Sequence, residues 1–420
     1  MPIPDLIEIV PLTKPVQTRV TVPGSKSITN RALILAALGQ GKTVLSGALW
    51  SEDTQVMVEC LRQLGFEIVV EEDAQELCNR TITITGQGGK IPNAGTREKP
   101  LELFVGNAGT AARFLSALVC LGNGFYRLSG VERMHERPQA ALFDALKKLG
   151  YEIDSVNNKL PALFHGKGTQ KGSCWVEADE SSQFASALFL CAKVGGWKVY
   201  AYFDRLPYVR MTQALIDTFP NEGGRFQIEP DTSSSSYFCA ANWILDGGIE
   251  IANYPTSHLQ VDTKIPSFLP LPGAVSRGND LGDSIMTAIV LAPLAEEEQL
   301  FTDLGPLRLQ ECERVFALRT ELEKCGAKVV EEGDTLTVFP SENNLHGAEI
   351  ETYNDHRMAM CFAILGLKIS GIRLKNPACV KKTFPNFFQK LAAPPEKGGL
   401  GVIILDKNGR VLREDELFAD

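Results

Sequence analysis

One recurring pattern constrains the fold of this 420-residue chain more than any other: a cluster of small polar residues opens directly into an apolar run of helical length. Such clusters are typical of helix starts, and a helix that is apolar nearly all round is usually buried inside a domain. The sequence therefore predicts six capped, buried helices. Their polar starts are residues 25–27, 107–110, 181–183, 233–236, 283–284 and 354–356, before apolar runs 32–38, 111–121, 184–192, 237–244, 285–294 and 358–367.

The spacing of these helices predicts repeated supersecondary units. Their starts lie roughly 50 to 85 residues apart, which is too long for a solenoid and fits a unit of strands with two helices. A second recurring segment, in which a helix ends at Gly and a strand follows, supports this plan. It occurs at residues 61–68, 146–153 and 322–329. We therefore expect an α/β protein of six units with the order β, α, β, α, β, β.

Composition restricts the partners and the setting. A net charge of −9 argues against nucleic acid or an anionic membrane as a partner. Residues 1–5 resemble neither a signal peptide nor a transit peptide, and no apolar run is long enough to span a membrane. The ten cysteines are scattered without C-x-x-C pairs, which favours free buried thiols over disulfides or metal ligands. We expect two or three domains and a cytoplasmic location.

The stretch Val22–Arg31 predicts a strand, a tight turn and a helix start. Backbone N–H groups at a helix start attract anions, and Lys26 and Arg31 add full positive charges. The glycine and lysine spacing of a Walker loop is absent, so a nucleotide does not follow. On this stretch alone, an anion site and a plain capped helix are both open.

Cations gather near the six helix starts of this acidic chain, which favours an anionic ligand over ordinary surface salt bridges. Each start taken alone is better explained as a plain helix cap than as a ligand contact. The cations are Lys26, Arg31, Arg113, Arg137, Arg314, Arg357 and Lys382.

Two later stretches differ from the repeats. Residues 262–282 are rich in Pro and Gly and predict an irregular connection. Asn408-Gly409 separates two apolar runs, 401–405 and 410–412, which predicts a hairpin. We expect this hairpin to be an appendage that begins at about residue 396.

Six motifs, in order along residues 18–391, together resemble the 5-enolpyruvylshikimate-3-phosphate synthase family. They are PGSKSITNR (23–31), LFVGNAGTAAR (103–113), RMHERP (133–138), SSQF (181–184), YNDHRMAMC (353–361) and KTFP (382–385). The resemblance implies the two-domain enolpyruvate transferase fold, an inside-out α/β barrel with three of the six repeated units in each domain. It also implies that residues 23–239 form one domain and residues 1–22 plus 240–420 the other, and that the two close on the substrates.

The activity that the resemblance implies is transfer of the enolpyruvyl group from phosphoenolpyruvate to the 5-hydroxyl of shikimate 3-phosphate, with release of phosphate. This is a step of aromatic amino-acid synthesis, it needs no metal or organic cofactor, and glyphosate inhibits it. The family also implies a monomer. Because both substrates are anions, a site of cations and helix N-termini suits them.

The family's site residues carry over onto matching positions of this chain. For shikimate 3-phosphate they are Lys26, Ser27, Arg31, Ser181, Ser182, Gln183, Arg205, Tyr208, Asp283 and Gln310. For phosphoenolpyruvate they are Lys26, Asn107, Gly109, Thr110, Arg137, Gln183, Arg314, Arg357 and Lys382. The catalytic residues implied are Lys26, Asp283 as proton acceptor and Glu311 as proton donor. Without the resemblance, Asp283 would be interpreted as a helix cap.

The chain departs from the family pattern at several positions. Gln310 replaces a lysine near the 5-hydroxyl, Pro306 replaces an asparagine, and Arg205 replaces a phosphate-binding serine. We expect Arg205 to restore the charge that Gln310 removes. Phe114 stands where many members have Pro, which predicts an altered response to glyphosate. The connection from residue 246 to 283 is short by roughly a helix and a strand, so we expect a shortened fourth unit.

Two alternatives remain from the sequence. One is a non-catalytic or repurposed protein that binds phosphorylated metabolites, which Gln310, Pro306 and the shortened unit keep open. The other is the related UDP-N-acetylglucosamine enolpyruvyl transferase, which relies on a loop cysteine and lacks the SSQF and YNDHR motifs. Cys120 lies in an apolar run, which favours a buried structural thiol.

Overall fold

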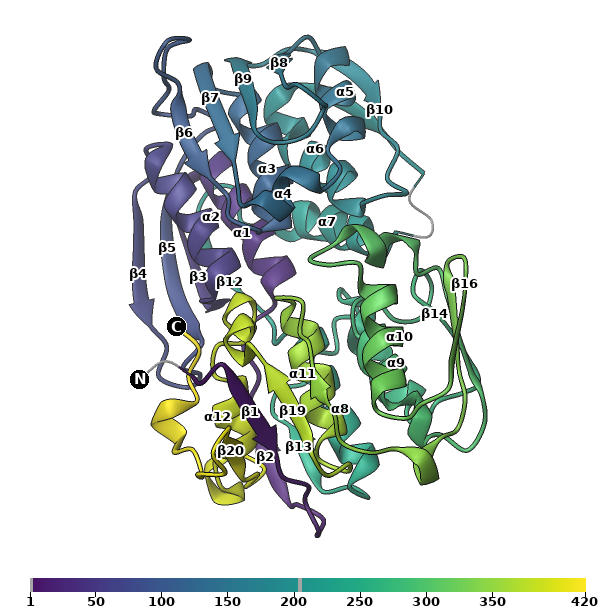
Figure 1. The fold of residues 1–420 in the computed structure, drawn as a ribbon. Coiled ribbons are helices and arrows are strands. Elements are labelled where there is room, and N and C mark those ends of the chain that lie inside the picture. The colour runs from purple at the N-terminus through teal and green to yellow at the C-terminus, as the bar shows by residue number, and fades with distance from the viewer. Residues whose placement is uncertain (1–2, 203–205) are drawn as a thin grey trace. The chain divides into compact units, whose positions relative to one another are not determined.

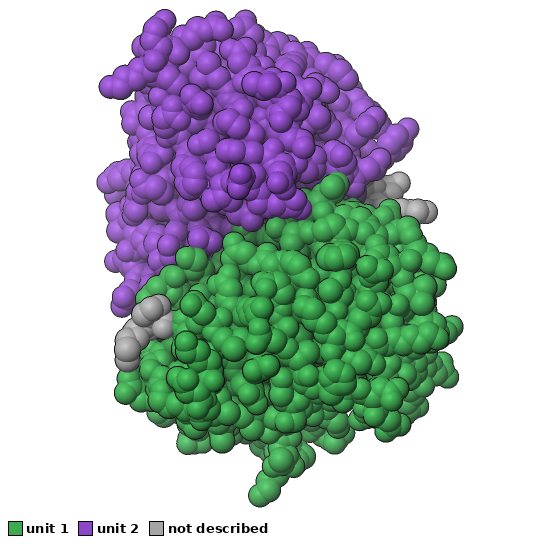
Figure 2. Space-filling model, in the orientation of Figure 1, with its two compact units in different colours: residues 1–23, 76–78, 230–420 green, residues 24–75, 79–229 purple. Residues whose placement is uncertain are grey.

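The computed structural model describes residues 3–202 and 206–420. Contacts divide the chain into two compact units, coloured separately in Figure 2. The first unit comprises Met1–Pro23, Glu76–Cys78 and Pro230–Asp420, and the second comprises Gly24–Gln75 and Asn79–Glu229. The predicted domain boundaries at residues 23 and 239 stay a prediction.

Three helices form the centre of the second unit: α1 (Lys26–Leu38), α3 (Gly109–Cys120) and α6 (Ser182–Gly195). They pack against one another, and every residue of α3 is buried (Figure 1). Two four-stranded sheets and a two-stranded one accompany them among the described residues. Their strand orders are β12-β3-β5-β4, β6-β7-β9-β8 and β10-β11.

The elements of these sheets follow the expected alternation of strands and helices. The first sheet contains β3 (Gln40–Leu49), β4 (Ile68–Glu72), β5 (Asn79–Gln87) and β12 (Gly224–Gln227). The second contains β6 (Leu101–Phe104), β7 (Asn123–Ser129), β8 (Glu152–Asp154) and β9 (Ala162–Lys167), and the third β10 (Gly172–Trp175) and β11 (Trp197–Tyr200). The remaining helices are α2 (Glu52–Gln63), α4 (Glu132–Glu136), α5 (Ala140–Lys148) and α7 (Pro207–Thr218).

The first unit is built on the same plan, around α8 (Thr232–Ile244), α9 (Ile285–Leu291) and α11 (His356–Leu365). These three helices pack together, and α9 and α11 are buried along their whole length. The sheets have the orders β18-β19-β1-β20, β14-β15-β17-β16 and β13-β2. All six predicted buried helices are therefore confirmed. The physical reason is that a helix with apolar residues on nearly all sides is stable only in the interior of a domain.

The strands of the first unit come from distant parts of the chain. One sheet contains β1 (Leu6–Ile9), β18 (Glu349–Ile350), β19 (Ile372–Lys375) and β20 (Ile404–Asp406). Another contains β14 (Ala274–Ser276), β15 (Gln299–Thr302), β16 (Val329–Glu332) and β17 (Thr335–Val338), and the last β2 (Thr18–Val20) and β13 (Ile249–Ile251). The outer helices are α10 (Arg314–Lys324) and α12 (Phe387–Ala392).

The predicted order β, α, β, α, β, β is seen along one segment from β14 through α9, β15, α10 and β16 to β17. The shortened fourth unit is also confirmed: the β13–β2 sheet has two strands, and the stretch after β13 contains the 3₁₀ helix η1 (Val261–Phe268). The sequence did not predict that the β10–β11 sheet of the second unit is equally small.

Glycine ends three helices as predicted. Gly65, Gly150 and Gly326 follow α2, α5 and α10 with φ of +92°, +95° and +88°. Only Gly adopts this left-handed conformation without steric cost, so each helix stops there and a strand follows. Side-chain caps are absent at three of the six predicted starts, because Ser25 before α1, Ala108 before α3 and Ser284 before α9 make no cap hydrogen bond. The cap of α8 is Asp231, which precedes the predicted start at residues 233–236.

The C-terminal hairpin forms, but it is not an appendage. Asp406 N donates to Arg410 O at 2.9 Å and Leu412 N donates to Ile404 O at 2.8 Å across the Asn-Gly turn. Its strand β20 pairs with β1, from Ile7 opposite Asp406 to Ile9 opposite Ile404. Burial of Ile404, at 1% exposed, draws the hairpin into the sheet.

A short tether, Glu76–Cys78, belongs to the first unit although it lies between β4 and β5 of the second. Glu76 is 4% exposed, and its carboxylate accepts hydrogen bonds from Thr21 Oγ1 at 2.6 Å, Lys390 Nζ at 2.8 Å and Asn386 Nδ2 at 2.9 Å. Cys78 Sγ lies 3.0 Å from Asn386 Oδ1. The chain therefore passes between the units at 23–24, 75–76, 78–79 and 229–230.

All ten cysteines lie within the described residues and are free thiols, eight of them buried. Among the described helices, none combines the length and the apolar character needed to cross a membrane.

Candidate functional site

Charged residues of the first unit gather around Asp283, which lies two residues before the first residue of α9 and is not its cap, since the N-cap is Ser284. Arg357 Nη2 and Arg277 Nη2 each donate to its carboxylate at 3.1 Å, to Oδ2 and Oδ1 respectively. Burial alone would raise the pKa of Asp283, but Arg357, Arg277 and Arg314 outweigh it and hold that pKa below its ordinary value. Asp283 is therefore a carboxylate fixed at both oxygens.

The backbone on each side of Asp283 is held by a second carboxylate. Asp262, in η1 and 2% exposed, accepts from Gly282 N at 2.7 Å and from Ser284 Oγ at 2.6 Å through Oδ1. Its other oxygen accepts from Ser233 Oγ at 2.5 Å. Burial raises the pKa of Asp262 although both serines lower it. The shortened fourth unit thus positions the Asp283 turn.

A second cluster centres on Arg314 at the start of α10, where it is 1% exposed. Its guanidinium binds Asp355 at two points, at 2.7 and 3.1 Å, and Glu311 Oε2 at 2.8 Å, and it donates to Gln310 Oε1. Burial lowers the pKa of Arg314, but Asp355 and Glu311 together raise it above its ordinary value. Arg314 is therefore a permanently charged group.

Lys382 joins this cluster from the end of the 3₁₀ helix η5 (Pro377–Lys382). Its Nζ lies 3.9 Å from Glu311 Oε1, and the side chain is 5% exposed. The first unit thus brings together all its predicted site residues: Asp283, Gln310, Glu311, Arg314, Arg357 and Lys382.

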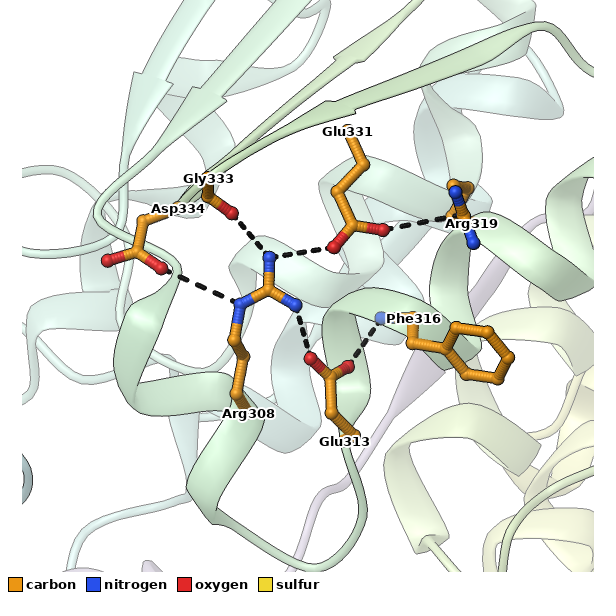
Figure 3. Close-up of a pocket in the computed structure, with 7 residues that line it drawn as sticks. All are labelled: Arg308, Glu313, Phe316, Arg319, Glu331, Gly333 and Asp334. Atoms are coloured by element: carbon orange, nitrogen blue, oxygen red, sulfur yellow. Dashed lines mark hydrogen bonds and ion pairs between the residues drawn. The ribbon is translucent and has the colours of Figure 1, made fainter.

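Arg308 and Glu313, drawn in Figure 3, bind each other and so hold both ends of the segment that carries Gln310 and Glu311. Arg308 donates to Glu313 Oε1, to Glu331 Oε1 at 2.8 Å and to Gly333 O, in a surface pocket that also includes Asp334. Glu313 in turn caps α10 by accepting from Phe316 N at 2.5 Å. These bonds hold residues 309–312 between two anchored points. Pro306 lies within the preceding 3₁₀ helix η3 (Gly305–Leu309).

In the second unit, Lys26 and Arg31 lie on α1, the helix of the predicted anion site. Lys26 Nζ is 3.0 Å from Asp53 Oδ2. Arg31 is 1% exposed and donates to Thr212 Oγ1 at 2.7 Å, Ser27 O at 2.8 Å, and Ser186 Oγ and Tyr208 O at 3.2 Å each. Burial lowers the pKa of Arg31 to about 10, only partly offset by Tyr208.

A second group of predicted residues in this unit surrounds the start of α3. Arg137 Nη1 donates to Asn107 O at 3.0 Å and to Asn107 Oδ1 at 3.3 Å. A Cβ on Gly109 would lie 2.6 Å from Arg137 Nη2 and 2.9 Å from Arg113 Nη1, so a larger residue would displace these guanidinium groups from their present positions. Thr110 Oγ1 accepts from Asn30 Nδ2 at 2.7 Å, which joins α3 to α1.

The SSQF motif begins α6. Ser181 caps this helix by accepting from Gln183 N at 3.3 Å, and Ser182 is its first residue. Gln183 Oε1 is buried and has no hydrogen-bond partner among the described residues. Tyr208 lies on α7 and contributes its carbonyl to Arg31. Arg205, the remaining predicted residue, lies outside the described residues.

Sequence reasoning missed three residues of the Asp283 and Arg314 clusters. Asp355 was predicted only as part of a helix start, which it is, since it accepts from Arg357 N at 2.9 Å. Asp262 and Arg277 fall in a stretch predicted to be an irregular connection. No pattern marks them, because their importance comes from contacts with residues distant in the sequence.

Comparison with known proteins gives one consistent result. The family model for EPSP synthase (3-phosphoshikimate 1-carboxyvinyltransferase) matches residues 10–221 and 263–391. A 3-phosphoshikimate 1-carboxyvinyltransferase from Opitutus terrae is 38% identical over 437 residues, covering 94% of this chain and 99% of the relative. One from Nostoc punctiforme is 36% identical over 430 residues, covering 92% and 98%.

Two solved structures share the fold. EPSP synthase from Acinetobacter baumannii matches with a TM-score of 0.68 at 21% identity, covering 96% of this chain and all of the other. The enolpyruvyl transferase NikO from Streptomyces tendae matches with a TM-score of 0.69 at 16% identity, covering 98% and 99%.

Proposed function

This chain belongs to the EPSP synthase family, and from that membership we propose that it transfers the enolpyruvyl group of phosphoenolpyruvate to the 5-hydroxyl of shikimate 3-phosphate, releasing phosphate. One observation carries the proposal: three cations, Arg314, Arg357 and Lys382, meet two carboxylates, Asp283 and Glu311, in a nearly buried cluster. Cations at low exposure bind anions strongly, and paired carboxylates can move protons.

We assign the phosphate and carboxylate of phosphoenolpyruvate to the basic residues of both units. Arg314, Arg357 and Lys382 serve from the first unit, and Lys26 and Arg137 serve from the second. Asn107, Gly109, Thr110 and Gln183 complete this set by shaping the turns beside them. Arginine suits the task because its planar donors pair with both anionic groups. The assignment requires the two predicted domains to close on the substrate.

Shikimate 3-phosphate falls to the second set of predicted residues. Lys26 and Ser27 on α1, Ser181, Ser182 and Gln183 at α6, and Tyr208 on α7 are proposed to contact it, with Asp283 and Gln310 from the first unit. Arg31 already donates four hydrogen bonds within the unit, to Thr212, Ser27, Ser186 and Tyr208. Its main proposed role is therefore to hold Ser27 and Tyr208 in place and to supply charge.

Asp283 is proposed to accept the proton of the 5-hydroxyl while Glu311 delivers a proton to the methylene carbon of phosphoenolpyruvate. The hydroxyl oxygen then bonds to the central carbon of phosphoenolpyruvate. Phosphate leaves that carbon, and the new methyl group returns a proton to the Glu311 carboxylate, which restores the double bond. In the free protein Arg357 holds the pKa of Asp283 low, which makes Asp283 a weak base. Binding of phosphoenolpyruvate to Arg357 would offset that charge and raise this pKa when the base is needed.

The cysteine-dependent alternative loses support. Cys120 is 0% exposed, and its Sγ lies 3.3 Å from Ser116 O inside α3. Burial raises the pKa of Cys120 well above its ordinary value, so its thiolate, the reactive form, is suppressed.

A coupled assay for phosphate release tests the proposal. The 420-residue chain is given shikimate 3-phosphate with phosphoenolpyruvate, and in a parallel reaction UDP-N-acetylglucosamine with phosphoenolpyruvate. Turnover in the first reaction alone is the expected result. Turnover only with the UDP sugar, or binding by calorimetry without turnover, would contradict it. We further propose a cytoplasmic monomer, which light scattering and cell fractionation can check.

A further inference from the structure

Position 310 contributes no positive charge to Asp283 in this chain. Gln310 stands where the family resemblance expects a lysine beside the 5-hydroxyl, and its side-chain oxygen accepts from Arg314 Nη1. A carboxylate that receives the proton of a hydroxyl needs a fixed orientation and must be ionised beforehand, and a neighbouring cation favours its ionised form. The structure therefore raises the question of which group replaces that lysine.

Arg277 is a cation in direct contact with Asp283 that no motif predicted. Its Nη2 lies 3.1 Å from Asp283 Oδ1, and its side chain is 14% exposed. The opposite carboxylate oxygen is bound by Arg357, so the two arginines hold Asp283 from different sides. Its Nε is buried and has no hydrogen-bond partner among residues 3–202 and 206–420.

The backbone that carries Arg277 is preorganised. Arg277 N donates to Thr302 O at 3.1 Å, which extends the pairing of β14 with β15 by one residue. The preceding Ser276 is fixed by its own bonds: its N donates to Asp280 Oδ2 at 2.9 Å and its Oγ to Asp303 Oδ2 at 2.5 Å. Arg277 therefore projects from an anchored turn, although the sequence around it predicts only an irregular connection.

We propose that Arg277 supplies, at the Asp283 carboxylate, the positive charge that a lysine at position 310 would supply, and so positions the base for the 5-hydroxyl of the acceptor. The inference rests on the proposed function. Arg205 lies outside the described residues, so the expectation placed on it stays a prediction beside this one.

The charges around Asp283 make one cation significant. Arg357, Arg277 and Arg314 act on it as positive groups, and Glu311 and Asp262 as negative ones. Without Arg277, two positive groups, Arg357 and Arg314, and two negative groups, Glu311 and Asp262, act on the Asp283 carboxylate. Asp283 then holds its proton to a higher pH, because fewer positive charges favour the ionised form.

The test is a mutant cycle on the full chain, with steady-state kinetics in shikimate 3-phosphate and phosphoenolpyruvate. Arg277→Gln is expected to lower kcat roughly 10- to 100-fold, as for a lost hydrogen bond to a charged group, with KM for phosphoenolpyruvate nearly unchanged. In the same variant, the acid limb of the pH profile of kcat/KM is expected to move to higher pH. Gln310→Lys in the same chain as Arg277→Gln restores most of the lost rate and returns the acid limb.

Two further variants exclude a folding defect. Arg277→Lys keeps the charge and is expected to retain most of the activity. Arg373→Gln removes an arginine paired with Glu349 at 3.7 Å on the same unit's surface and leaves kcat and the pH profile as they are. Thermal melting of each variant shows whether it is folded.

The outcomes separate the two proposals. An active wild type whose Arg277→Gln variant keeps its kcat and its acid limb overturns the role of Arg277 alone. A loss that Gln310→Lys leaves unrepaired also overturns it. A wild type that turns over neither substrate pair overturns the proposed function and with it this inference.

Discussion

Buried arginines in this protein are stabilised in two different ways. Arg314 is surrounded by carboxylates, which raise its pKa, whereas Arg31 binds hydroxyls and carbonyls, and burial lowers its pKa to about 10. Arg314 thus keeps its charge, and Asp355 and Glu311 balance that charge before any ligand binds. Arg31 carries a charge that its hydrogen-bond partners do not cancel, which favours an anion near α1.

The Arg314 pair leads to a stability prediction. Asp355→Asn leaves Arg314 without its bidentate counter-charge at a position that is 1% exposed. The expected loss is about 3–5 kcal/mol in the free energy of unfolding, measured by urea denaturation. The control is Asp415→Asn, which breaks an exposed pair with Arg413 and should change stability little. Equal effects of the two substitutions would contradict the prediction.

Gly109 offers a test of the proposed phosphoenolpyruvate site. Gly109→Ala places a Cβ 2.6 Å from Arg137 Nη2, so that guanidinium must shift. We expect KM for phosphoenolpyruvate to rise by about tenfold, the equivalent of one weakened charged hydrogen bond, while KM for shikimate 3-phosphate stays the same. An unchanged KM for phosphoenolpyruvate would remove Arg137 from the site.

At the scale of elements, the glycines that end α2, α5 and α10 can be tested by two matched substitutions. A Cβ at Gly150 meets no atom within 4 Å, whereas one at Gly326 would lie 2.4 Å from Asn344 O. Gly150→Ala should therefore cost about 1–2 kcal/mol from left-handed backbone alone. Gly326→Ala should cost more, because the backbone must also move. The free energies of unfolding of the two variants are compared by their denaturation midpoints, provided that the denaturant slopes are equal. A larger loss of stability for Gly150→Ala than for Gly326→Ala would refute this account.

The elements that the sequence predicted well are those with a local cause. Each buried helix has an apolar run and a polar start, and Gly65, Gly150 and Gly326 set the ends of α2, α5 and α10. The site residues of the first unit were predicted from family motifs, and the structure brings them together. Their roles as substrate ligands stay predictions.

The parts that could not be predicted depend on pairing across the chain. The contact of Arg277 with Asp283 could not be predicted without knowing that β14 pairs with β15. The contact of Asp262 with the Asp283 turn likewise depends on the position of η1. The C-terminal hairpin was predicted, but its place beside β1 was not, because nothing local in residues 404–406 specifies a partner near the N-terminus. Long-range register is set by burial of the assembled sheet.

At the scale of the whole molecule, the tether Glu76–Cys78 is the feature to test. Glu76→Gln removes the charge that Lys390 pairs with at 2.8 Å while keeping the side chain's shape. We expect faster hydrogen exchange at the amides of residues 75–79 and an unfolding free energy lower by about 1–3 kcal/mol. Glu71→Gln, on the exposed side of β4, is the control. Unaltered exchange in the tether would show that Glu76 does not hold it.

The position of β1 has a consequence for how the protein is made. This strand lies between β19 and β20, with Leu6 opposite Lys375 and Ile7 opposite Asp406. Chains leave the ribosome from the N-terminus, and domains generally fold in that order. Residues 24–229 can therefore be synthesised and folded while β1, which is synthesised before them, still lacks the strands with which it pairs. A nascent chain that stalls before residue 372 carries β1 unpaired, as an open edge available to other chains.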